Sequence, residues 1–229
     1  MYLPPAFEET DPAEVRGLIE AAGAATLVTV VDGALFASTV PLLFEPDPGG
    51  DGPGRLVGHL ARANPQARRS SAEVDALAVF NGVTGYVSPT LYPTKQDGGR
   101  VVPTWNYEVV HLWGPLVVHD DPAWVLDLVT RLTGHHEARY RQRGDAAGLP
   151  AMEPWAVADA PADFIDGQLR AIVGVEIPVT RLAAKRKLSQ NRPEADRAGV
   201  LAGFSARAAA GVSGAAAMAA RVRQANPGS

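Results

Sequence analysis

The chain has 229 residues, a formal net charge of −4 at neutral pH and 46% hydrophobic residues, a composition ordinary for a globular protein. It has no cysteine, which excludes disulfides and thiolate metal sites. No apolar run approaches the ~20 residues that a membrane-spanning helix needs. The start, Met1–Pro5, has neither the basic region nor the apolar stretch of a signal peptide. We therefore expect a cytoplasmic protein that has no membrane association.

The charge is unevenly distributed along the chain. From Arg181 to the C-terminus there are nine Lys and Arg but only two carboxylates, Glu194 and Asp196. The preceding residues hold 12 Lys and Arg against 23 Asp and Glu. A basic end on an acidic body can contact DNA, an anionic cofactor or the acidic surface of a second subunit, and composition alone leaves all three open.

The N-terminal half predicts one helix followed by antiparallel strands. Asp11 is expected to cap a helix that ends near Gly23, with Pro12 in its first position and Glu14 reaching back in a capping box. Pro41 indicates an edge position or a bulge in its strand. Asp32-Gly33 is a hairpin signal, and Asn64 is expected to cap a short helix. Strands are predicted over residues 25–31, 34–44, 55–60, 74–81 and 85–88, with a loop over 46–54.

The C-terminal half predicts longer helices. A strand is expected over 107–119, interrupted at Gly114-Pro115, followed by a helix from Asp121 to about residue 143. After a loop over 144–152, a helix over 161–169 should turn Phe164, Ile165 and Leu169 inward, and a strand should cover 171–182. Beyond Pro193 four glycines weaken the helical pattern, so we expect an amphipathic or frayed C-terminal helix.

These elements favour a mainly β fold. Six or more strands with antiparallel hairpin signals and few helices are typical of a Greek-key or split β-barrel with peripheral helices. A chain of this length can form a single domain when its core is a barrel. We expect one domain over residues 1–204 and an Ala/Gly/Arg-rich tail, helical or frayed, over 205–229.

Three segments concentrate side chains suited to an anionic, planar ligand. Residues 58–66 run from a strand into a capped helix start, where backbone N–H groups and Arg62 favour an anion. Residues 102–107 gather aromatic and amide side chains, which can form a stacking platform. Residues 185–192 hold four cations and three neutral polar side chains. Each segment also has a purely structural explanation: a helix cap, a core anchor and a solvated basic loop.

Other familiar sites are absent from the sequence. It contains no Gly-x-Gly-x-x-Gly fingerprint, no phosphate-binding Gly-x-x-x-x-Gly-Lys loop and no Gly-x-Ser-x-Gly elbow. His135-His136-Glu137 places adjacent histidines about 100° apart on a helix, unlike paired metal ligands. We therefore expect no metal site.

Several short segments of the sequence, in the same order along the chain, resemble those of the PaiB-type negative transcriptional regulators. They cover residues 1 to about 204. The matching segments are Met1-Tyr2-x-Pro4 with Phe7, residues 58–66, 86–89 and 102–107 with His111, Pro154-Trp155, and residues 159–161, 169–174 and 187–192.

The resemblance implies a split β-barrel related to the pyridoxamine-phosphate-oxidase-like proteins, with FMN bound at the interface of a homodimer. By that similarity, Ser38 and Thr39 should lie near the isoalloxazine ring. The residues expected near the ribityl phosphate are His59, Arg62, Asn64 and Gln66. Those expected near the ring or the phosphate, from either subunit, are Lys187, Ser189 and Gln190. The sequence departs from the family pattern in two places. Thr39-Val40 stands where a histidine followed by a leucine is expected, and residues 81–84 stand where a Gln-Gly-Pro-His type loop is expected, with Thr84 in place of its histidine.

Two classes of function follow from the resemblance. The first is a flavin-binding transcriptional regulator, although the sequence shows no helix-turn-helix pattern and DNA binding normally needs a basic face. The second is an FMN-dependent oxidoreductase using NAD(P)H or oxygen, with His59, His111 and Tyr107 as potential proton donors and no assigned catalytic residue. A third alternative keeps the barrel but binds haem or no cofactor.

Overall fold

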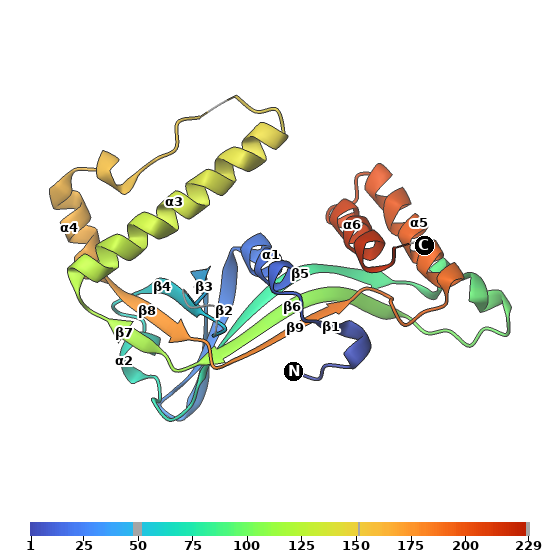
Figure 1. Cartoon of the computed structure of the whole chain (residues 1–229), viewed down its shortest axis with the longest axis horizontal. Coiled ribbons are helices and arrows are strands. Elements are labelled where there is room, and N and C mark those ends of the chain that lie inside the picture. The colour runs from blue at the N-terminus through green and yellow to red at the C-terminus, as the bar shows by residue number, and fades with distance from the viewer. Residues whose placement is uncertain (48–51, 151, 228–229) are drawn as a thin grey trace. The chain divides into compact units, whose positions relative to one another are not determined.

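The computed structural model describes residues 1–47, 52–150 and 152–227. The chain divides into two compact units (Figure 1). Unit 1 comprises Met1–Ala22, Phe80–His111 and Ala183–Ser229. Unit 2 comprises Gly23–Val79 and Leu112–Leu182.

Unit 2 is built on antiparallel strands in the hydrogen-bonded order β5-β2-β3-β4-β8-β7. Buried and half-buried side chains alternate along β2, because successive side chains of a strand point to opposite faces of the sheet. The strands are β2 (Ala24–Val31), β3 (Ala34–Glu45), β4 (Arg55–Ala61), β7 (Val117–His119), β8 (Ile172–Pro178) and the first residues of β5 (Ala76–Val87). The predicted hairpin at Asp32-Gly33 and the interruption after Gly114 are both confirmed.

Strand β3 changes partner at Pro41. Residues 34–41 pair with β2, and residues 42–45 pair with β4. The proline therefore lies where the strand leaves one ladder and joins the next, rather than on an edge strand. Gly58 allows the close approach here, because a Cβ on it would lie 2.7 Å from the Pro41 carbonyl oxygen and 2.6 Å from Leu42 Cδ2.

Unit 2 also carries three α-helices: α2 (Gln66–Arg69), α3 (Pro122–Ala146) and α4 (Ala162–Ala171). The predicted helix start is confirmed, and Asp121 caps α3 by accepting the Ala123 N–H at 3.0 Å. The stripe Val125, Leu128 and Leu132 is buried. Of the inward face predicted for α4, Ile165 and Leu169 are half-buried, but the inward position of Phe164 is wrong because its side chain is 56% exposed.

Unit 1 contains strands in the order β1-β9-β6-β5 and three α-helices. The strands are β1 (Glu8–Glu9), most of β6 (Thr104–Gly114), most of β9 (Arg181–Lys187) and the rest of β5. The helices are α1 (Pro12–Ala22), α5 (Glu194–Ala209) and α6 (Ala215–Ala225). Short 3-10 turns cover Pro5–Phe7, Pro89–Leu91 and Pro93–Gln96.

Helices α5 and α6 pack against each other (Figure 1) and supply much of the core of unit 1. The buried cluster consists of Val87, Tyr92, Leu188, Val200, Phe204, Met218, Ala219 and Val222. The C-terminal segment is thus a helical hairpin, and the boundary expected between residues 204 and 205 lies inside α5. Gly199, which weakened the predicted helix, serves packing: a Cβ there would lie 2.1 Å from the Leu91 carbonyl oxygen.

The structure corrects two predicted strand bounds and one predicted helix cap. The strands predicted over 74–81 and 85–88 form one strand, β5. The strand predicted over 171–182 is two strands, because the Thr180 N–H turns to donate to the Trp113 carbonyl at 2.8 Å. Glu14 forms no capping box, since Glu9 accepts the Asp11 N–H at 2.9 Å. Residues 48–51 of the expected loop 46–54, and residue 151, lie outside the described residues.

Candidate functional site

The residues expected to contact FMN fall into two sets, one in each unit. Unit 2 holds Ser38, Thr39, His59, Arg62, Asn64 and Gln66. Unit 1 holds Lys187, Ser189 and Gln190.

Asn64 joins two of the segments in unit 2. Its amide Nδ2 donates to Ser38 Oγ at 3.1 Å, and its Oδ1 accepts the Gln66 N–H at 2.9 Å. The first contact connects β3 to the turn between β4 and α2, and the second confirms the predicted cap. Thr39, beside Ser38, has an exposed side chain with no hydrogen bond among the described residues.

Gln66 points into the protein. It is fully buried, and its Nε2 donates to the Leu27 carbonyl and to Thr29 Oγ1, both at 3.2 Å. Its donors are therefore used within unit 2. The helix that it begins, α2, has only four residues, so the site draws on side chains rather than on a helix N-terminus.

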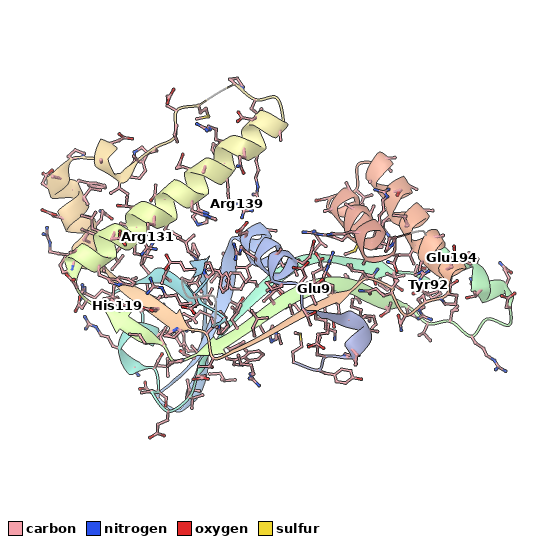
Figure 2. All side chains as sticks on the ribbon, in the orientation of Figure 1. Glu9, Tyr92, His119, Arg131, Arg139 and Glu194 are labelled. Carbon is pink, nitrogen blue, oxygen red and sulfur yellow. The ribbon has the colours of Figure 1, made fainter. Side chains whose placement is uncertain are left out.

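His59 belongs to a row of residues in register across three strands. It lies opposite Gly174 on β8, which in turn lies opposite His119 on β7. Directly paired residues share a face, so all three are on one side of the sheet. The Trp124 ring of α3 covers Gly174 and stacks on His119 with the ring centroids 3.9 Å apart; His119 is labelled in Figure 2.

The environment of His59 keeps its imidazole neutral. The side chain is half-buried, and desolvation by burial lowers its pKa below 6.5. Its ring makes no hydrogen bond with another described residue. A neutral imidazole can accept or donate a hydrogen bond, which suits the edge of a flavin ring.

Arg62 is largely engaged by its own unit. Its Nε donates to the Arg170 carbonyl at 2.8 Å and its Nη2 to the Ile172 carbonyl at 3.0 Å. Its Nη1 lies 2.6 Å from the carboxylate of Asp120. Since a guanidinium has five N–H donors, two remain for a ligand. Arg62 thus fastens the end of β4 to the junction of α4 and β8, which sequence spacing did not indicate.

In unit 1 the three expected residues have different surroundings. Lys187 Nζ lies 2.5 Å from Thr104 Oγ1 and 5.9 Å from the centre of the Tyr107 ring. Ser189 is buried, and its hydroxyl donates to Asn106 Oδ1 at 3.1 Å. Gln190 folds back, donating to the Arg186 carbonyl and accepting the Leu188 N–H, both at 2.6 Å.

Ser189 and Gln190 therefore shape the turn after β9. Ser189 has a φ of 69°, a left-handed conformation that side chains other than glycine rarely adopt, and both hydrogen-bonding side chains stabilise it. Lys187 keeps donors available.

The described part of the chain offers neither a metal site nor a membrane span. It holds no group of three or more His, Asp or Glu residues placed to bind a metal ion. His135 and His136 meet edge to face, with ring centroids 5.3 Å apart. No helix in the same residues is long and apolar enough to cross a membrane.

Comparison with known proteins identifies the family. Residues 1–181 match the family described as "Putative FMN-binding domain". Over 201 residues the chain is 30% identical to the protease synthase and sporulation protein PAI 2 of Bacillus subtilis, covering 88% of this chain and 87% of that one. The chain belongs to the PaiB-type FMN-binding family. A second member, the uncharacterized protein AN0679 of Emericella nidulans, is 31% identical, with 89% of this chain and 90% of the relative covered.

The fold of this PaiB-type protein is that of the FMN-binding split barrels. The flavocytochrome Anf3 of Azotobacter vinelandii superposes with a TM-score of 0.54 at 14% identity, covering 83% of this chain and 74% of that one. The expected fold class, a mainly β split barrel with peripheral helices, is confirmed, and so is an FMN-binding domain.

The side chains in unit 2 fit FMN chemically. Thr39 and Ser38 offer hydroxyls, His59 offers a neutral imidazole, and Arg62 retains two cationic N–H donors. Hydroxyl and imidazole donors suit the carbonyl and nitrogen edge of an isoalloxazine ring, and a guanidinium suits a phosphate. Gln66 adds no donor to this set, because it is buried and its Nε2 donates within unit 2.

Proposed function

We propose that FMN binds to unit 2 through Ser38, Thr39, His59 and Arg62, and that this flavin site serves a PaiB-type regulator. The contact between Asn64 and Ser38 carries the proposal, because it fixes β3 beside the turn after β4. The resemblance implies FMN contacts from both of these segments. Bound FMN supplies the redox chemistry, while the protein supplies position and electrostatics.

Each residue has a distinct role in this proposal. Ser38 and Thr39 bind the polar edge of the ring, and Arg62 adds charge-assisted bonds to the phosphate. Asn64 and Gln66 hold the turn in place through their own contacts. In unit 1, Lys187 is proposed as a further FMN contact, and Ser189 and Gln190 position it.

Retention of FMN on a sizing column tests the cofactor site. We expect the wild-type protein to carry a flavin absorbance peak. Thr39→Val should weaken FMN about 2- to 12-fold, the loss of one hydrogen bond worth roughly 0.5–1.5 kcal/mol. Thr133→Val in α3 is the matched control, because Thr133 is half-buried and its side chain forms no hydrogen bond with another described residue. Equal retention by both variants would remove Thr39 from the site.

We propose further that the protein is a homodimer. In unit 2, Leu35, Phe36 and Val74 are 80%, 36% and 49% exposed, beside an open cavity of about 510 Å³ partly lined by Trp113. Apolar surface of this kind marks an interaction site. Leu35→Lys should lower the mass measured by light scattering towards that of a monomer; an unchanged mass would place the interface elsewhere.

Regulation by direct DNA contact has its own test. We expect a DNA fragment to be bound with an affinity that falls steeply as salt rises, because phosphate contacts release counterions. If the protein does not change the electrophoretic mobility of the DNA fragment even at low salt, regulation does not act through direct DNA contact.

The alternative is an FMN-dependent oxidoreductase, which the half-buried imidazole of His59 favours because an imidazole kept neutral by burial can accept a proton. Bleaching of bound flavin by NADH or NADPH would support it. A flavin that neither nucleotide reduces would count against it.

A further inference from the structure

Lys185 in unit 1 is a buried cation without a carboxylate. It is 6% exposed, and its Nζ donates to the Tyr2 carbonyl at 3.0 Å. The same Nζ lies 5.6 Å from the centre of the Tyr2 ring and 5.3 Å from that of Tyr107. No carboxylate of a described residue lies within ion-pair distance of it. An ammonium has three N–H donors, so hydrogen bonding uses one of them.

Lys187 repeats the pattern two residues further along β9. Residues two apart on a strand share a face, and the Nζ atoms of Lys185 and Lys187 both lie over the Tyr107 ring. Lys187 likewise has no carboxylate partner in the described chain. Glu8, paired in register with Lys185, is exposed and forms no ion pair with it. Positive charge that is partly buried and uncompensated is costly, which favours an external anion.

Exposed aromatic rings accompany these two cations. Tyr86 and Trp105 are 42% and 53% exposed, and their rings meet edge to face with centroids 5.7 Å apart. Trp105 lies two residues before Tyr107 on β6, so the two share a face. Large exposed rings next to cations form a platform on which a planar group can stack.

We propose that this surface of unit 1, formed by Tyr86, Trp105, Tyr107, Lys185 and Lys187, binds a planar aromatic anion. The rings stack on the planar part, and the two ammonium groups bind its phosphate or carboxylate. Two sources share this chemistry. One is FMN, and that arm rests on the proposed function; the other is an aromatic substrate or effector that carries an anionic group.

Calorimetric titration of the full-length protein tests the proposal with two matched pairs of probes. FMN is compared with riboflavin, and adenosine monophosphate with adenosine, so that each pair differs only in its phosphate. We expect at least one phosphorylated probe to bind at least tenfold more tightly than its neutral partner. A tenfold effect corresponds to one charge-assisted hydrogen bond.

Variants assign the effect to this surface. Lys187→Met and Lys185→Met should each weaken the phosphorylated probe about tenfold and leave the neutral one unchanged. Lys187 is only half-buried, so its variant remains informative if Lys185→Met does not fold. Lys95→Met, at an exposed lysine of the same unit, is the matched control and should stay within twofold. Glu8→Gln should tighten binding, because it removes from the same face a negative charge that repels the anion.

The outcomes separate the two sources. If only FMN depends on the lysines, the surface is part of the flavin site. If adenosine monophosphate depends on them and FMN does not, or FMN does not bind at all, the surface takes a separate aromatic anion, whatever the fate of the proposed function. If no phosphorylated probe depends on Lys185 or Lys187, the proposal is overturned.

Discussion

Gly174 in β8 lies directly beneath the indole ring of Trp124. A Cβ on Gly174 would lie 2.1 Å from Trp124 Cζ3, so only glycine allows the ring to lie against the strand. The Trp124 ring also stacks on the ring of His119. His119 Nε2 in turn lies 2.9 Å from Glu176 Oε2. The absence of a side chain at Gly174 thus allows Trp124, His119 and Glu176 to lie together in unit 2.

Gly174→Ala should destabilise the protein by about 1–3 kcal/mol, because the added methyl displaces the Trp124 ring. Gly134→Ala in α3 is the matched control. A Cβ there meets no atom within 4 Å, and alanine is the better helix former, so stability should rise by up to about 1 kcal/mol. Urea unfolding measures both. Equal effects of the two changes would contradict the packing argument.

Strand β9 is fixed to its neighbours in unit 1 by one arginine. The Arg186 side chain is 8% exposed; its Nε lies 2.9 Å from Glu108 Oε1, and its Nη1 lies 3.2 Å from both Glu9 and Glu14 (Figure 2 labels Glu9). Arg221 of α6 approaches the other oxygen of Glu108 at 3.3 Å. Arg186 Nη2 also donates to Gln224 Oε1 of α6 at 2.9 Å, so β1, α1, β6 and α6 meet at a single guanidinium.

Arg186→Met should cost about 3–5 kcal/mol of stability, because it leaves the buried carboxylate of Glu108 without its main partner. Arg69→Met is the control: Arg69 pairs with Asp32, both side chains are more than half exposed, and such a pair is worth about 0–1 kcal/mol. Thermal denaturation compares the two. A loss below about 1 kcal/mol at Arg186 would show that the network contributes little.

Across the whole chain, the basic C-terminal segment is less available to DNA than its composition indicates. Arg186 and Arg221 are paired with carboxylates. Arg192 lies over Tyr92, and Arg181 lies over Trp113. Much of this positive charge therefore serves the protein's own packing, which favours a small anion over a duplex as its external partner.

The histidines give the whole molecule a pH dependence. Desolvation lowers the pKa of His59, His111 and His136 below 6.5, and neighbouring positive groups add to the effect at the last two. The unfolded chain therefore binds more protons than the folded one, so stability falls as pH drops below about 6.5. Urea unfolding at pH 7.5 and pH 5.5 should show this loss, and His59→Gln should reduce it. Equal stability at both values would refute the assignment.

Part of the candidate site could be predicted from sequence and part could not. The resemblance to PaiB-type proteins selected the segments around Ser38, Asn64 and Lys187, and the family is confirmed. The inward position of Gln66 and the carbonyl contacts of Arg62 have no local signal, because their partners lie 30 or more residues away. The position of Lys185 likewise has no local signal, because Tyr2, whose carbonyl accepts its hydrogen bond, lies 183 residues away in the sequence.

The sequence by itself determined the family, the mainly β class and most element positions, because strand alternation, turn residues and helix caps are local properties. Tertiary structure decided the order of the C-terminal helices, where Gly199 weakens the helix locally but permits contact with Leu91. It also decided which cations remain open to a ligand. Burial and partner choice depend on residues far apart in the chain, and no local pattern encodes them.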